Sequence, residues 1–277
     1  MDRIVSVSTM AFDGYSLEQA LDELAALGVE YVEPASVDRI FQHLAEADFC
    51  DARAAWLRDE LTARRQRCHS LSAHMDLTQA DSVERFTRRL EFAKAIGAST
   101  VNSIAGPAAN LAGFRANIPA LARRAEALGL TIALENHGDL LDRGGQILEF
   151  IRAVGHPAVR VNYDTGNAWY YSKGGVDPVA ELRELAPAVA HLHVKTPKVV
   201  DGLMRWVALG DGELDLRGIG RVLRERMPGV AVSYELSPRQ RSREFEPRWR
   251  APEVPPLPEL RRTIRASLEG LRGVLAG

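Results

Sequence analysis

The feature that most constrains this chain is a repeat of short apolar runs separated by longer segments of helical period. The runs are rich in Val, Ile and Leu, which is typical of buried parallel strands. Their polar carboxyl ends follow one another at steps of 23, 41, 31, 30, 29, 29 and 42 residues. A period of roughly 30 residues is the size of one strand–helix unit. The runs are RIVSVSTM, GVEYVEP, CHSLSAHM, STVNSIAG, LTIALENHG, VRVNYDTGN, VAHLHVKT and VAVSYEL.

Eight such units in 277 residues predict an α/β protein with a single-domain (β/α)8 TIM barrel. Helix boundaries support the same division of the chain. Capping signals at helix starts are Ser16 with Gln19, Asp81 with Glu84, and Asp177 with Pro178. Glycines that end helices are Gly97, Gly129 and Gly155. No Gly/Ser linker or charge block divides the sequence, so we expect one domain over residues 1–277.

Two long segments are expected at the mouth of the barrel. Residues 196–215 join the seventh strand to its helix and contain Trp206. Residues 237–257 follow the eighth strand and contain Trp249 and five prolines. Loops of this length in compact domains usually form a lid or a partner surface. An ordered surface loop without a function is the alternative for the second segment.

Composition excludes several classes of protein. The 35 Lys and Arg against 37 Asp and Glu give a net charge of −2, whereas proteins that coat nucleic acid carry excess positive charge. Two cysteines, Cys50 and Cys68, form neither a disulfide framework nor a metal-binding spacing. No apolar run approaches the roughly 18 residues that span a bilayer. The opening MDRIVSVSTM has no signal-peptide pattern. We therefore expect a cytoplasmic protein that binds neither nucleic acid nor membrane.

The last four strand-like runs each end on a residue that can bind a metal ion: Glu135, Asp164, His193 and Glu235. In such a barrel, the carboxyl ends of the strands carry the active site. Three carboxylates that converge on one point repel one another, and a divalent cation relieves that repulsion. Oxygen ligands with one nitrogen suit Mn, Mg, Co or Zn. The alternative is that each acid is a solvated strand end or a paired buried group.

Motifs in the second half of the chain carry a family resemblance. The ordered set LENHG, NYDTGN, HLHVK, LGDGELD and YEL resembles the xylose-isomerase-like TIM-barrel superfamily, which includes sugar phosphate isomerases and epimerases and AP endonuclease family 2. The similarity covers most of the chain and is clearest over residues 134–236. It implies that Glu135, Asp164, His193 and Glu235 are the metal ligands. In the epimerase branch, the residues equivalent to Glu135 and Glu235 also move the proton.

One position departs from the family pattern. Several branches have a histidine three residues after the aspartate, where this chain has Asn167. Asn167 can bond a substrate hydroxyl but cannot act as an acid or base near neutral pH. The departure weakens the resemblance to endonuclease IV, to ketose epimerases and to some dehydratases.

Further side chains are expected around the same point. His137 should point inward beside Glu135, as a general acid or base or as a hydrogen-bonding support. Lys195 is expected to protonate a leaving oxygen or bind an anionic group, with a salt bridge to a carboxylate as the alternative. We expect the substrate to be bound by His74, Glu33, Asn167, Trp169 and Trp206. A satisfied buried polar group is the alternative for Glu33, and loop packing is the alternative for Trp169.

These features predict a divalent-metal-dependent sugar isomerase or epimerase. It would remove a proton beside the carbonyl of a keto-polyol and form an enediolate, with manganese as the favoured ion. One alternative is a lyase on the same barrel, an inosose-type dehydratase or a 3-oxo-glycoside β-eliminase, to which a small partner subunit could bind. A DNA-repair nuclease and a non-catalytic subunit are further, disfavoured alternatives. We expect a small carbohydrate as substrate and a homo-oligomer as the assembled form.

Overall fold

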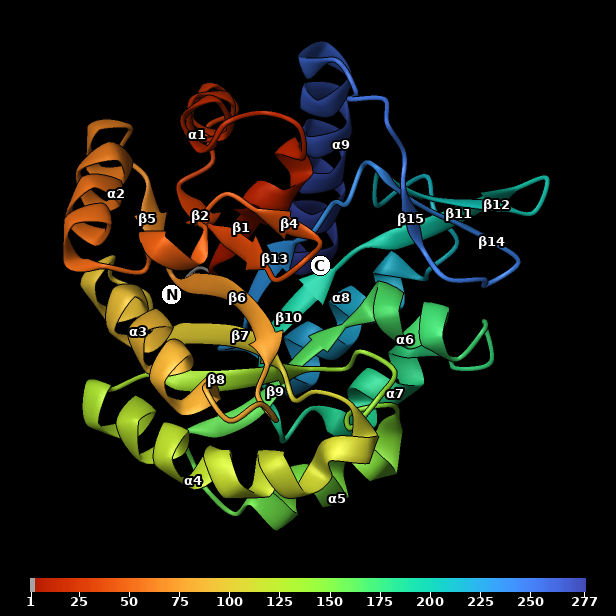
Figure 1. Ribbon diagram of the computed structural model, residues 1–277. Coiled ribbons are helices and arrows are strands. Elements are labelled where there is room, and N and C mark those ends of the chain that lie inside the picture. Colours follow the sequence, from red (N-terminus) through yellow and green to blue (C-terminus); the bar gives the residue numbers. More distant parts are fainter. Residues whose placement is uncertain (1–2) are drawn as a thin grey trace.

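The computed structural model describes residues 3–277, so Met1 and Asp2 of the opening run lie outside it. A parallel sheet closes on itself, because β1 pairs with β2 on one side and with β13 on the other. The predicted (β/α)8 TIM barrel is confirmed (Figure 1). The barrel strands are β1 (Val5–Ser8), β2 (Tyr31–Glu33), β3 (Ala35–Val37), β6 (Ser70–Asp76), β7 (Thr100–Ile104), β8 (Thr131–Glu135), β9 (Val159–Asp164), β10 (Val189–Val194) and β13 (Ala231–Tyr234).

The second position in the barrel is shared by two short strands on either side of Pro34. β2 pairs with β1, and β3 pairs with β6, so the two together close the barrel between their neighbours. Proline has no N–H to donate and interrupts the hydrogen-bonded ladder. The 41-residue step that follows Glu33 holds β4 (Phe41–Gln42), the short helix Glu46–Asp48, α2 (Asp51–Ala63) and β5 (Arg67–Cys68).

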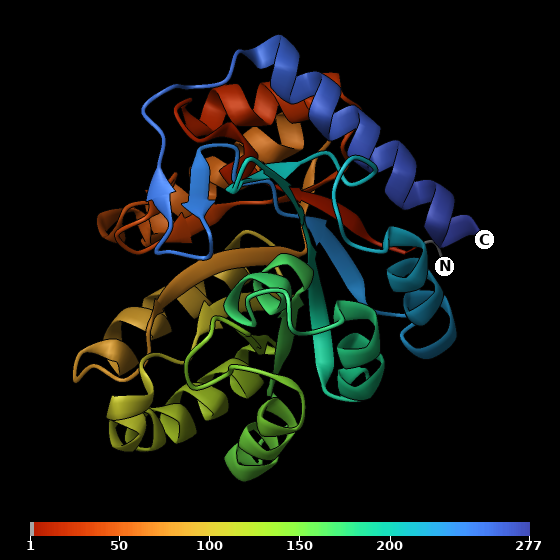
Figure 2. The same cartoon turned by 90° about the vertical axis from the view of Figure 1, so that its right-hand side faces the viewer.

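Helices cover the outside of the barrel (Figure 1). Figure 2 shows α9 crossing the outer face beside α1, where Arg261 pairs with Glu23. None of the helices within residues 3–277 is both long and apolar enough to cross a bilayer. The helices are α1 (Leu17–Ala26), α2, α3 (Ser82–Ala95), α4 (Leu111–Leu128), α5 (Gly144–Val154), α6 (Thr165–Tyr171), α7 (Pro178–Leu185), α8 (Leu216–Arg226) and α9 (Leu257–Ala276), with short 3-10 turns at Thr9–Phe12 and Ala108–Asn110.

Most helix boundaries agree with the capping signals. The Ser16–Gln19 capping box forms, Asp177 caps α7, and the predicted glycine stops follow their helices with positive φ. The capping box predicted at Asp81 is wrong. Asp81 has helical angles (φ −87°, ψ −1°), whereas a capping residue needs an extended backbone to turn its side chain back. Its carboxylate instead lies 3.7 Å from Arg85.

The two long mouth segments combine into a second, antiparallel sheet. Residues 196–215 form the hairpin β11 (Thr196–Val200) and β12 (Leu203–Val207). Residues 237–257 add β14 (Gln240–Arg243) and β15 (Trp249–Arg250), in the order β11–β12–β14–β15. Figures 1 and 2 show this sheet at one side of the barrel, apart from the parallel strands.

The interior of the barrel is polar, and the apolar core lies between the sheet and the helices. Leu71, Val101 and Leu192 belong to that core. Asn102 and Asn162 alternate with the apolar residues and reach side chains of other strands inside the barrel. Because side chains alternate along a strand, the two faces of one sheet hold these two environments. The barrel interior is therefore built for hydrogen bonds and charge.

A fully buried arginine fastens the loop after β3 to the barrel. Arg89 of α3 is 0% exposed and donates to the backbone carbonyls of Ala73 and His74. Its guanidinium also pairs with Asp38 at 2.7 Å and with Glu46 at 2.8 Å. Burial alone raises the pKa of Glu46, but hydrogen bonds from three arginines outweigh burial and lower it to about 2. The network keeps Glu46 ionised.

We predict that Arg89→Met destabilises the fold on the order of 3 kcal/mol, because it leaves buried carbonyls and acids without their donor. Arg88→Met is the matched control: Arg88 pairs with the same Glu46 but is 39% exposed, so its loss should cost less than about 1 kcal/mol. Urea unfolding of both variants measures the difference. Equal losses would contradict the proposed importance of burial.

Candidate active site

The structure brings the four predicted ligands together at the carboxyl ends of consecutive strands. Glu135 ends β8, Asp164 ends β9, His193 lies on β10, and Glu235 directly follows β13. Each offers one donor atom, and these atoms all lie within 4.8 Å of one another. All four residues are at most 3% exposed. The carboxylates therefore share a small, dry volume with one imidazole.

This donor set fits a divalent cation. Burial raises the pKa of Asp164 to about 7, with the charges of Glu135 and Glu235 acting in the same direction against Lys195. The Oδ2 atom of Asp164 is buried, and its close partner is Lys195 Nζ at 2.7 Å, in an ion pair. Three carboxylates with one imidazole supply hard oxygen ligands and a nitrogen, as Mn, Mg, Co and Zn sites do. A bound cation would relieve the repulsion that otherwise favours protonation.

Glu135 is held by donors on both carboxylate oxygens. Oε2 lies 2.8 Å from His193 Nδ1, and Oε1 accepts from Asn167 Nδ2 at 2.8 Å. Burial raises the pKa of Glu135, but charges and hydrogen bonds from histidines outweigh it and hold the pKa well below the usual range. Glu135 is thus a fixed, ionised ligand. The donors around it are His193, Asn162, His74, Asn167 and His137.

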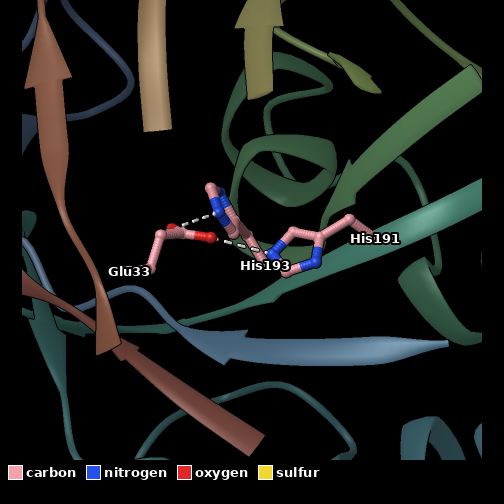
Figure 3. Close-up of side chains that lie close together, drawn as sticks. All are labelled: Glu33, His191 and His193. Atoms are coloured by element: carbon pink, nitrogen blue, oxygen red, sulfur yellow. Dashed lines mark hydrogen bonds and ion pairs between the residues drawn. The ribbon is translucent and has the colours of Figure 1, made fainter. Parts of the chain in front are cut away.

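The carboxylate of Glu33 faces the imidazoles of two histidines of β10 (Figure 3). Its carboxylate contacts His193 Nε2 at 2.8 Å and His191 Nε2 at 2.9 Å, and it is 0% exposed. This corrects the expected placement of Glu33 on the wall that meets substrate. The Glu33 carboxylate contacts Nε2 of His193 and so orients the imidazole with Nδ1 toward Glu135, Asp164 and Glu235. Metal-binding histidines are commonly held in this way, with a carboxylate on the nitrogen that does not bind the metal.

Lys195 was expected to contact the substrate or, alternatively, to form a salt bridge with a carboxylate. The structure shows the salt bridge. Its Nζ lies 2.7 Å from Asp164 Oδ2 and donates to Glu235 Oε2 at 2.5 Å. Although burial lowers the pKa of Lys195, the charges of both acids outweigh it and raise the pKa above the usual value. Trp206 is buried with its ring 5.1 Å from Nζ. Trp206 therefore packs on Lys195 instead of on the cavity.

Each residue of the motif NYDTGN from Asp164 onward has a contact that shapes the turn after β9. Asp164 caps α6 through the Asn167 backbone N–H, at 2.7 Å. Thr165 Oγ1 donates to the Lys195 carbonyl at 2.9 Å and ties the turn to β10. At Gly166, a Cβ would lie 2.5 Å from Lys195 Cγ and 2.6 Å from Trp206. The motif thus sets the positions of a predicted ligand and of Lys195 together.

The remaining predicted residues fall into two groups. His137 is 26% exposed with Nδ1 3.2 Å from Glu135, and His74 Nε2 contacts Glu135 at 3.2 Å; both border the cavity above the cluster. Asn167 bonds Glu135 beside them. Trp169 instead packs on Phe245 with ring centroids 4.9 Å apart. The expected stacking of Trp169 on a sugar is therefore corrected to loop packing.

Sequence reasoning missed the residue that covers the site. The cavity above the cluster has a volume of about 20 Å³, and Arg248 and Gln240 of the second mouth segment line it. That volume holds about one water molecule. A larger ligand therefore enters only when covering side chains move. Arg248 is one of several arginines in its segment, and no sequence signal distinguishes it from the others.

Comparison with known proteins agrees with this geometry. The family described as "Xylose isomerase-like TIM barrel" matches residues 21–266. The chain belongs to this family. It is similar to an inosose dehydratase of Klebsiella pneumoniae, with 29% identity over 119 residues that cover 37% of this chain and 40% of that enzyme. The chain is thus aligned with less than half the length of that relative.

Two solved structures show the same fold at low identity. One is the probable 3-DHS dehydratase AsbF of Bacillus anthracis, with 16% identity, coverage of 97% of this chain and 98% of that chain, and a TM-score of 0.73. The other is a D-psicose 3-epimerase from Clostridium cellulolyticum H10, with 16% identity, coverage of 98% and 99%, and a TM-score of 0.73. The same fold is thus found in one protein described as a probable dehydratase and in one described as an epimerase.

We predict that Gly166→Ala lowers activity about tenfold or more, although alanine favours a helix. The added methyl group must displace Lys195 or Trp206. A small displacement of a reacting group lowers the rate of the reaction strongly. The matched control is Gly145→Ala in α5, where the nearest atom to a Cβ is 3.7 Å away. Steady-state kinetics of both variants tests the prediction. Full activity of Gly166→Ala would contradict it.

We predict that Mn²⁺ binding releases protons and weakens as the pH falls. Burial lowers the pKa of His193, but the charges of Glu33 and Glu235 and hydrogen bonds to acids outweigh it and raise the pKa well above the usual value. A cation needs the Nδ1 lone pair, so it must displace a proton. Affinity should fall about tenfold per pH unit for each proton released.

Isothermal titration calorimetry in two buffers with different ionisation enthalpies measures this proton release. His193→Gln, which carries no titrating proton, should reduce the release. Binding with the same affinity at pH 6 and pH 8 would contradict the prediction.

Proposed function

We propose that this protein is a divalent-metal-dependent lyase, a dehydratase that removes a proton beside the carbonyl of a keto-polyol and then eliminates the β-hydroxyl. The observation that carries the proposal is that His137 and Lys195 both border the cavity above the carboxylate cluster. One is a proton acceptor and the other a proton donor. Elimination needs one group of each kind.

Glu135, Asp164, His193 through Nδ1, and Glu235 would hold the cation. When bound there, a divalent cation supplies Lewis-acid chemistry, drawing electron density from a carbonyl oxygen. Glu33 and Asn167 keep two of these ligands oriented through the contacts described above.

His137 is suited to take the proton from carbon. Burial and the nearby charge of Arg248 lower its pKa below the usual value against the opposing effect of Glu135. The imidazole is therefore neutral at pH 7. Arg248 Nη2 donates to Nε2 at 3.4 Å, so Nε2 is the lone-pair nitrogen and Nδ1–H faces Glu135. The carboxylate fixes this tautomer and stabilises the imidazolium that forms.

Lys195 is suited to protonate the leaving oxygen. Its two carboxylate partners keep it an ammonium at neutral pH. A departing hydroxide is a far stronger base than the lysine amine, since the pKa of water is about 15.7. Proton transfer from Nζ is therefore favourable in spite of the raised pKa of Lys195. The leaving group departs as water.

The sugar isomerase or epimerase of the sequence prediction is the second candidate function. Glu135 and Glu235 line the cavity from β8 and from the end of β13, as a reaction on two faces of a substrate requires. Against this, the donors around Glu135 make it a weak base. Elimination leaves Glu135 as a ligand only and assigns the two proton transfers to His137 and Lys195.

We expect a Mn-loaded protein in D2O to exchange the proton beside the carbonyl of its keto-polyol substrate and to form an alkene-type product, as followed by proton NMR with an inosose and D-fructuronate as probes. His137→Gln should slow exchange about 100-fold, because it removes the base. Lys195→Met should retain exchange while slowing loss of the hydroxyl. Lys198→Met, an exposed lysine on β11, is the matched control and should behave as the parent.

The same experiment includes ketohexoses and 3-keto-glycosides. A new sugar isomer without elimination would support the epimerase instead. Exchange that survives His137→Gln but is lost in Glu235→Gln would overturn the role given to His137.

A further inference from the structure

We propose that Arg248 is a substrate-binding residue that holds a carboxylate, and that the substrate is a sugar acid rather than a neutral sugar. The inference rests on the proposed function only for the location of the substrate. Arg248 is half-buried and lines the cavity beside Glu235 and His137.

The guanidinium of Arg248 contacts neutral groups. Nη1 donates to Asn167 Oδ1 and to Gln240 Oε1, each at 3.4 Å, and Nη2 donates to His137 Nε2 at 3.4 Å and to the Tyr171 hydroxyl. Across residues 3–277, no carboxylate forms an ion pair with it. The 3.4 Å contacts are long for hydrogen bonds, so a charged acceptor would replace them favourably.

Other arginines of the same segment have partners of their own. Arg239 and Arg250 both pair with Asp13. Arg241 donates to the backbone carbonyls of Pro238 and Gln240. Arg248 alone among these four points its charge into the cavity and keeps it unpaired.

Two aromatic rings and the backbone of its own segment orient the guanidinium of Arg248 at the cavity. Its guanidinium carbon lies 4.8 Å from the ring centroid of Tyr170 and 5.2 Å from that of Tyr171. The carbonyl of Glu246, two residues before Arg248, accepts hydrogen bonds from the Tyr170 hydroxyl at 2.8 Å and from Ser242 Oγ at 2.7 Å. Aromatic support leaves the N–H edge of the guanidinium free to bind oxygen.

The other positively charged side chain at the cavity, that of Lys195, is not available to bind an anion. Lys195 is already paired with Asp164 and Glu235. Recognition of an anion therefore depends on Arg248. Two N–H groups on one planar fork match the two oxygens of a carboxylate. The negative charges of Glu135 and Glu235 on the same cavity disfavour a dianionic phosphate, so the structure favours the monoanion.

The test uses three ketohexose probes that differ only at C6: D-fructose, D-fructuronate and D-fructose 6-phosphate. Binding to the full chain is followed by tryptophan fluorescence, since Trp206 lies beside Lys195. We expect D-fructuronate to bind about tenfold or more tightly than D-fructose. Arg248→Met should abolish that preference, and Arg248→Lys should restore part of it. Arg243→Met, an exposed arginine of β14, is the matched control.

Three results would overturn the proposal: equal or absent binding of D-fructuronate, a preference for the phosphate, or a preference that survives Arg248→Met. An unchanged Tm shows that the variant remains folded. Binding and chemistry are measured separately. If D-fructuronate binds through Arg248 but neither exchanges nor eliminates in any acid tested, the proposed reaction fails while the assignment of Arg248 stands.

Discussion

The burial of like charges at the carboxyl ends of the barrel strands is the constraint on which the rest of the site depends. Glu135, Asp164 and Glu235 cannot share a dry volume unless positive charge compensates them. His193 on β10 and Lys195, directly after that strand, supply that charge. The contacts of the motifs NYDTGN and HLHVK therefore serve one purpose, which is to place cationic donors against three acids.

The polar interior of the barrel follows from the same constraint. A protonated His193 needs an acceptor on its lower side, and the fully buried Glu33 provides it. Glu33 in turn requires donors, which come from His191, Ser70 and Asn102. Each buried group thus requires another below it, because an unsatisfied polar group in a core is costly. Stability comes instead from the apolar layer between sheet and helices.

The sequence is sufficient to predict the barrel and the four converging side chains, because both depend on period and on strand ends. It is not sufficient to place Glu33. The second strand breaks at Pro34, so β3 continues toward the mouth and Val37 lines the cavity where Glu33 was expected. Arg248 was missed for another reason. Its position depends on how two distant segments pair into one sheet, and local sequence carries no signal for that pairing.

One hydrogen bond connects recognition to proton transfer. Arg248 donates to His137 Nε2, the same lone pair that the proposed base needs. A substrate carboxylate that binds the guanidinium competes for that donor and frees Nε2. It also neutralises a positive charge that lowers the pKa of His137, so the imidazole becomes a stronger base when an acid occupies the cavity. A neutral sugar does neither. The base would therefore be fully available only when the substrate that Arg248 recognises is present.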